Sequence, residues 1–88
     1  MADWQLFFTK EAQDDLDKLD KSLCQRIITK VVWLNDNFDQ TVHLPLGFDW
    51  KGFYKLRIGD WRVVYEFDKM KKEIFVHRIE NRDKVYKK

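Results

Sequence analysis

The feature that most constrains the fold of this chain is a two-residue turn between two alternating runs. Hydrophobic and polar side chains alternate through residues 53–58 and again through residues 61–67, with Gly59-Asp60 between them. Such alternation is typical of strands with one buried face. Glycine at the first central position suits a type II′ turn, because glycine adopts a positive φ without strain. We therefore predict a β-hairpin whose register is set by this turn.

The predicted register decides which side chains share a face of the sheet. Arg57 lies opposite Arg62, and Lys55 lies two positions further along the first strand. The other face carries the large apolar residues of both strands, and we expect it to be the core: Tyr54, Leu56, Ile58, Trp61, Val63, Tyr65 and Phe67. Three cations therefore gather on the face away from the core.

The rest of the chain predicts further strands and two helices. Residues 3–9 alternate as a first strand does, and Thr9 and Asp20 are suited to cap two following helices with apolar residues at helical spacing. Residues 38–52 show no period and indicate a long ordered loop, and residues 73–79 form a last strand. The order β-α-α-β-β-β predicts an α+β fold, in which an N-terminal helical hairpin covers one face of an antiparallel sheet.

Length and composition limit the class of protein. The 88 residues, 44% of them hydrophobic, allow one domain, residues 1–88. No apolar run approaches the roughly 18 residues of a membrane span, and the first residues lack the pattern of a secretory leader, so we expect a cytoplasmic protein that does not contact membranes. One cysteine, Cys24, and two histidines provide no zinc cluster. We expect no metal and no other cofactor.

Charge is distributed unevenly along the chain. Residues 1–40 hold five Lys/Arg against eight Asp/Glu, a balance of −3, whereas residues 41–88 hold twelve against seven, a balance of +5. A basic second half is what binding to a polyanion or to an acidic partner requires. The alternative is that these lysines and arginines only keep the surface soluble.

The opposed arginines carry the functional argument. Like charges directly across a sheet destabilise it by about 0.2–1 kcal/mol, so stability alone would favour another residue opposite Arg57. Glu66 and water could relax the repulsion, which would leave a merely solvated face. We favour an anion site, because arginine matches phosphate oxygens with a bidentate geometry and a strand holds it rigidly. Cations interleaved with aromatic residues on a sheet point to RNA.

Cleavage of RNA on this face would not use a pair of metal ions, because Glu66 is its only carboxylate in the predicted hairpin. In a metal-free reaction the ribose 2′-OH attacks its own phosphate, while a base removes its proton, cations stabilise the added charge and an acid protonates the leaving oxygen. Lysine serves as a base only when neutral, and neighbouring arginines disfavour the charged ammonium. This favours Lys55 as the base.

The run from Tyr54 to Glu66, with His77-Arg78-Ile79 and Arg82-Asp83-Lys84-Val85-Tyr86, resembles the RelE/ParE toxin superfamily of toxin-antitoxin pairs. The helical hairpin also matches, so the resemblance covers nearly the whole chain. It implies the toxin of a type II toxin-antitoxin system, an mRNA interferase that enters the ribosomal A site. There it acts as an endoribonuclease on mRNA and inhibits translation until a cognate antitoxin protein neutralises it.

The resemblance also implies roles for individual residues. Lys55 matches the candidate general base, and Arg62 matches the arginine that stabilises the transition-state phosphate. Arg82 matches an arginine acting as general acid or charge stabiliser, and Tyr86 matches a tyrosine that orients or stacks on a nucleotide. Candidate RNA-binding residues outside this catalytic set are Arg57, Lys51 and Arg78, with Arg78 as the substitute for Arg82.

Two positions depart from the family pattern, and other functions stay open. Phe53 stands where well-studied RelE toxins have a second lysine, and Asn81 stands where many relatives have histidine; either change could reduce activity or shift codon preference. The same scaffold serves ParE-like inhibitors of DNA gyrase, and a non-catalytic RNA-binding module is a further alternative. His77 is expected to be an ordinary strand residue, because the sequence places no carboxylate to orient it. Tyr86 could instead pack the tail against the sheet.

Overall fold

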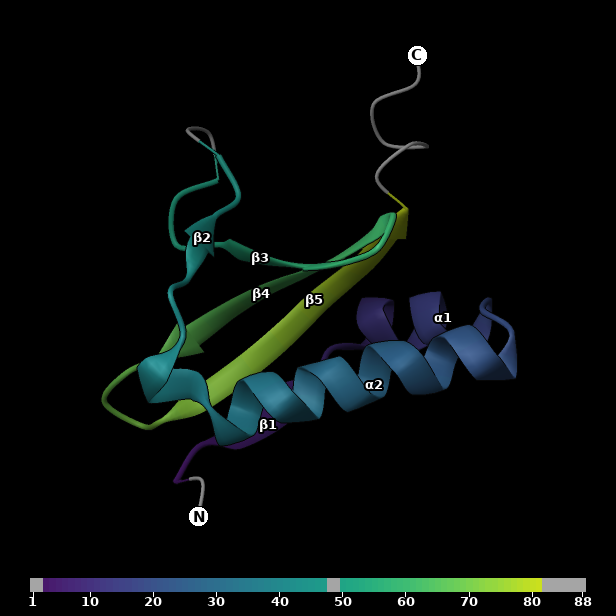
Figure 1. Cartoon of the computed structure of the whole chain (residues 1–88). Coiled ribbons are helices and arrows are strands. Elements are labelled where there is room, and N and C mark those ends of the chain that lie inside the picture. Colours follow the sequence, from purple (N-terminus) through teal and green to yellow (C-terminus); the bar gives the residue numbers. More distant parts are fainter. Residues whose placement is uncertain (1–2, 48–49, 82–88) are drawn as a thin grey trace.

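In residues 3–47 and 50–81, which the computed structural model describes, helices pack against a five-stranded sheet (Figure 1). Strand β1 (Gln5–Phe8) precedes two helices, α1 (Lys10–Asp17) and α2 (Lys21–Asp36). The remaining elements, in chain order, are the 3₁₀ helix η1 (Phe38–Gln40) and the strands β2 (Leu44–Pro45), β3 (Tyr54–Ile58), β4 (Trp61–Asp68) and β5 (Glu73–Asn81). The predicted α+β class is confirmed.

The strands lie in the order β1-β5-β4-β3-β2, so the two ends of the described chain meet in the sheet. All neighbouring pairs are antiparallel except β1 and β5, which run parallel. The sheet is therefore mixed, and the expectation of a purely antiparallel sheet is wrong at this edge. The physical reason is that β1 and β5 are joined by a long crossover through the helices, and parallel pairing requires such a connection.

Both helices begin at the caps that the sequence predicts. The Thr9 hydroxyl accepts a hydrogen bond from the Ala12 amide at 3.2 Å, and the Asp20 carboxylate accepts one from the Leu23 amide at 2.8 Å. Such caps satisfy amides that have no partner within the helix. Figure 1 shows both helices on the same side of the sheet. Between helices and sheet lies one core: Trp4, Ala12, Ile27, Val31, Leu34, Phe38, Ile58, Val63, Tyr65, Ile74, Val76 and Ile79.

The segment expected to be an irregular loop contains two short elements, η1 and β2. Strand β2 pairs with β3 at the outer edge, where proline is tolerated because that edge makes no further ladder bonds. His43 fastens the segment to the sheet. Its Nε2 donates to the Phe38 carbonyl at 3.1 Å, and its Nδ1 accepts from the buried Tyr65 hydroxyl at 2.7 Å. Burial lowers the pKa of His43, and burial also raises the pKa of Tyr65.

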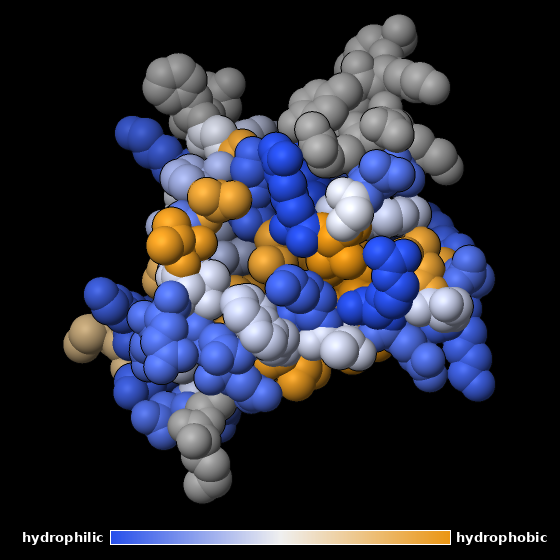
Figure 2. Space-filling model, in the orientation of Figure 1, coloured by the Kyte–Doolittle hydropathy of each residue, from blue (hydrophilic) through white to orange (hydrophobic). Residues whose placement is uncertain are grey.

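The face crossed by α2 keeps some apolar side chains in contact with solvent. Figure 2 shows hydrophobic patches between hydrophilic side chains on this side of the molecule. Ile28, Val32 and Trp33 are exposed on α2, and the ammonium of Lys30 lies 4.1 Å from the centre of the Trp33 ring. Within the described residues, no helix combines the length and the hydrophobicity needed to cross a bilayer.

Candidate anion-binding groove

The hairpin has the register that the turn predicts. Gly59 has a φ of 59°, and Arg57 pairs with Arg62 while Lys55 pairs with Val64. Lys55 is therefore the diagonal neighbour of Arg62, and diagonal positions lie within about 7–8 Å of each other, which is within reach of long side chains. Arg57 is exposed and Lys55 half-buried. The three cations share the face of the sheet that the helices leave open, as predicted.

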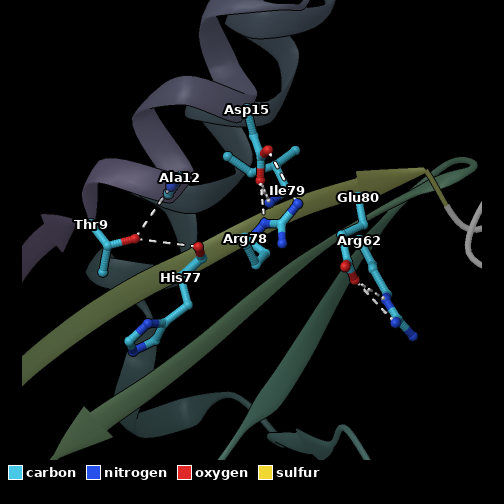
Figure 3. Close-up of polar contacts among 8 residues, drawn as sticks. All are labelled: Thr9, Ala12, Asp15, Arg62, His77, Arg78, Ile79 and Glu80. Atoms are coloured by element: carbon cyan, nitrogen blue, oxygen red, sulfur yellow. Dashed lines mark hydrogen bonds and ion pairs between the residues drawn. The ribbon is translucent and has the colours of Figure 1, made fainter.

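Arg62 differs from the predicted picture in its surroundings. The residue is only 9% exposed, and its Nε and Nη2 both lie 3.1 Å from Oε1 of Glu80, its cross-strand neighbour on β5. This carboxylate offsets the repulsion between Arg62 and Arg57 and fixes the direction of the guanidinium (Figure 3). Glu80 lies on β5, outside the hairpin, so the two hairpin strands alone do not show how the charge of Arg62 is balanced.

A groove of about 530 Å³ opens beside Arg62 on this face. Strands β4 and β5 form its floor, and the loop before β3 and the start of α1 form its walls. The lining residues are Glu11, Leu46, Trp50, Phe53, Arg62, Val64, His77, Arg78 and Glu80. Cationic, acidic and aromatic side chains thus meet in one hollow of a size suited to a nucleotide-sized ligand.

A β-bulge shapes the floor of the groove. Val64 pairs with Arg78 and the next residue, Tyr65, pairs with Val76, so His77 is an extra residue on β5. Bulges re-aim side chains and are frequent beside active sites. Here the bulge is held by α1: the Thr9 hydroxyl donates to the His77 carbonyl at 3.3 Å, and a carboxylate oxygen of Asp15 accepts from the Ile79 amide at 2.9 Å. Figure 3 shows both contacts.

Asp15 also engages Arg78, one of the predicted RNA-binding residues. Arg78 Nε lies 2.8 Å from Oδ2 of Asp15, and this hydrogen bond raises the pKa of the guanidinium, with burial opposing it. The Asp15 side chain is only 11% exposed, although its neighbour Asp14 on α1 is exposed. Asp15 bonds to the edge of β5 just beyond the end of β1. Helical periodicity does not predict such a tertiary contact.

His77 has the carboxylate partner that the sequence failed to reveal. Its Nε2 is hydrogen-bonded to Oε2 of Glu66 on β4, and its ring packs edge-on against Phe53 at 5.2 Å between centroids. The expectation that no carboxylate would orient this histidine is therefore wrong. The register of β5 could not be assigned from the sequence. The bulge adds one residue to the strand, so alternation alone does not show which face His77 occupies.

The remaining predicted site residues are placed differently. Lys51 is exposed in a turn beside the groove and lines a neighbouring hollow with Trp50 and Phe53. Arg82 and Tyr86 lie outside the described residues. Within residues 3–47 and 50–81, no three His, Cys, Asp or Glu side chains cluster closely enough to hold a metal ion.

Comparison with known proteins identifies the family. Residues 6–86 match the sequence profile of the family described as ParE toxin of type II toxin-antitoxin system, parDE. The chain belongs to this family. It is accordingly a toxin of a toxin-antitoxin system within the RelE/ParE superfamily, as the resemblance implied. No curated protein sequence matches this toxin.

Solved structures with the same fold include both named branches of the superfamily. The toxin-antitoxin complex RelBE2 from Mycobacterium tuberculosis matches with a TM-score of 0.79 and 24% identity, over 90% of this chain and 98% of that one. The isolated E. coli RelE toxin gives 0.71 and 20%, over 89% and 83%. The chromosomal ParDE system from Pseudomonas aeruginosa gives 0.72 and 23%, over 89% and 95%. At these identities the likeness establishes the fold of the toxin.

Proposed function

We propose that this toxin is a RelE-like mRNA interferase, an endoribonuclease that cleaves ribosome-bound messenger without a metal and so inhibits translation. The observation that carries the proposal is the arrangement of Lys55, Arg57 and Arg62 on the open face, beside a groove with aromatic walls. Like-charged neighbours held rigidly on paired strands are suited to binding a phosphate. Placing these three cations together does not stabilise the sheet, because like charges at neighbouring positions repel each other.

In the proposed reaction Lys55 removes the proton from the ribose 2′-OH. The 2′-oxygen then attacks the adjacent phosphorus, the bond from phosphorus to the 5′-oxygen breaks, and the leaving oxygen takes up a proton. Arg62, oriented by Glu80, stabilises the charge on the phosphate, and exposed Arg57 holds the RNA backbone. Of the roles that the family resemblance implies, Arg82 keeps that of charge stabiliser, and Tyr86 keeps that of orienting or stacking on a nucleotide. The products are a 2′,3′-cyclic phosphate and a 5′-hydroxyl.

We further propose that a cognate antitoxin binds the toxin and silences it, as in the RelB-RelE complexes that share its fold. The exposed apolar residues of α2, Ile28, Val32 and Trp33, offer such a partner a surface to cover. We place the toxin in the cytoplasm, where ribosomes and messenger are available.

Inhibition of DNA gyrase is the second candidate, because the matching family profile is that of ParE toxins. One experiment separates the two. The toxin is induced in bacterial cells, transcript 5′ ends are mapped, and chromosomal DNA breaks are scored in the same culture. The interferase proposal predicts new transcript ends within coding regions before any DNA damage. DNA breaks with intact transcripts would support the gyrase alternative, and growth without either would support a non-catalytic RNA-binding module.

Variants make this experiment specific to the cations of the open face. Lys55→Met keeps the length of the side chain but removes the base, and Arg57→Gln removes an exposed cation with little effect on the core. Both should lose messenger cleavage. Arg26→Gln, which removes an exposed arginine of α2 outside the groove, is the matched control and should cleave like the wild type.

A further inference from the structure

We propose that His77, oriented by Glu66, is a further catalytic residue of this toxin: it donates the proton that the leaving 5′-oxygen requires. The inference rests on the proposed ribonuclease function and assigns the acid of that same site. It starts from a contact that the sequence did not reveal, the hydrogen bond between Nε2 of His77 and the carboxylate of Glu66.

His77 lies across the central strand from the proposed base, Lys55. Lys55 on β3 pairs with Val64 on β4, and Val64 pairs with Arg78, the neighbour of His77, on β5. Neighbouring strands lie about 4.8 Å apart, so the backbones that carry Lys55 and His77 are separated by about 10 Å across the open face. Displacement at phosphorus places the attacking and leaving oxygens on opposite sides. A base on β3 and an acid on β5 satisfy that requirement.

Arg62, the proposed phosphate ligand, lies on the strand between these two groups. Arg62 is on β4, the central strand of the three, and it lines the same groove as His77. A phosphate held by Arg62 would therefore have the proposed base on one side and the imidazole on the other. The bulge produces this placement, since it adds His77 to β5 at the level of Val64 and Tyr65.

Among the cationic groups of the groove, His77 is chemically the best suited to donate a proton. Arginine stays protonated in proteins, so it stabilises charge well but gives up a proton poorly. Arg78, which also lines the groove, is further held in its charged form by Asp15. Histidine exchanges a proton near neutral pH. With Nε2 engaged by Glu66, the proton leaves from Nδ1 to the 5′-oxygen as its bond to phosphorus breaks, and the neutral ring is reprotonated from solvent.

Charged side chains from several elements surround His77. Glu66 contacts the ring directly. The others line the groove or the neighbouring hollow around it: Arg62 and Asp68 on β4, Arg78 and Glu80 on β5, Glu11 on α1, and Lys69 in the turn after β4. Charges of both signs therefore surround the proposed acid.

The test uses a substrate whose leaving group needs no acid. A messenger fragment bound to purified ribosomes carries either the normal 5′-oxygen or a 5′-bridging sulfur at the cleavage position, and single-turnover rates are measured from pH 5.5 to 8.5. On the oxygen substrate, His77→Gln should cleave about 100-fold more slowly or worse and lose the alkaline decline of the wild type. On the sulfur substrate it should cleave at nearly the wild-type rate.

Controls separate the possible failures. Lys55→Met should be slow on both substrates, because sulfur replaces the need for an acid but not for a base. On the oxygen substrate, Glu66→Gln should cleave more slowly than the wild type. Glu73→Gln, the same change at the far end of β5, should cleave at the wild-type rate. Thermal unfolding confirms that each variant is folded. An equal defect of His77→Gln on both substrates would overturn the assignment. A wild type that cleaves neither substrate would refute the ribonuclease proposal itself.

Discussion

Replacement of Asp15 by alanine should destabilise the toxin, because this side chain is only 11% exposed and contacts β5. Its carboxylate accepts hydrogen bonds from the Ile79 amide at 2.9 Å and from Arg78 Nε at 2.8 Å, and so joins α1 to β5. Loss of an acceptor for a part-buried amide costs about 1–3 kcal/mol. The ion pair adds less than about 1 kcal/mol, because the side chain of Arg78 is half exposed and can be hydrated.

Alanine offsets part of this loss, since it favours a helix by about 0.5 kcal/mol over aspartate. The net destabilisation of Asp15→Ala should therefore be about 2 kcal/mol. Urea unfolding followed by circular dichroism measures it: with an m-value of about 1 kcal/mol/M for a domain of this size, the midpoint should fall by about 2 M with the slope unchanged.

Two variants test the reasoning behind this magnitude. Asp15→Asn keeps an oxygen acceptor for the Ile79 amide and should lose about half as much stability. Asp14→Ala removes an exposed carboxylate from the adjacent position of the same helix and should stay within about 0.5 kcal/mol of the wild type. If Asp15→Ala were no less stable than Asp14→Ala, the helix-to-strand contact would not stabilise the fold as argued.

Three further outcomes are expected. Thr9→Ala should cost about 1–2 kcal/mol in urea unfolding, because the hydroxyl both caps α1 and bonds the His77 carbonyl, whereas Thr9→Ser should retain most stability. Gly59→Ala should cost about 1 kcal/mol, since φ is 59° there and the positive angle, rather than space, is the obstacle. Burial lowers the pKa of His43, so the unfolded chain binds more protons than the folded chain, and stability should fall as pH drops below about 6.5. Urea midpoints at pH 7.5 and 5.5 measure this fall, which should be smaller in His43→Gln. An equal loss of stability in the wild type and in His43→Gln would refute it.

The parts of the fold that local chemistry determines could be predicted from the sequence. Glycine at position 59 specified the turn, and the turn specified every pair between β3 and β4. The caps at Thr9 and Asp20 were equally local, because each depends on an amide three residues away. The parallel pairing of β1 with β5 and the two-residue strand β2 could not be predicted, since neither leaves a period in its own segment.

The candidate site was predictable only where it depends on the hairpin. The shared face of Lys55, Arg57 and Arg62 followed from the turn. The ion pair of Glu80 with Arg62 and the hydrogen bond of Glu66 with His77 did not, because both depend on β5, which carries a bulge that shifts its register by one residue after Val76. A slip of one residue exchanges the two faces of a strand, so the partners of Arg62 and His77 became visible only in the folded chain.

The ends of the cut RNA test the central claim most directly. Purified toxin is added to ribosomes paused on a defined messenger, and the 3′ end of the upstream fragment is analysed chemically. Cleavage by the 2′-OH predicts a 2′,3′-cyclic phosphate there and a 5′-hydroxyl on the downstream fragment, and Lys55→Met should abolish both. A 3′-hydroxyl paired with a 5′-phosphate, or a messenger left intact by the folded wild-type toxin, would contradict the account.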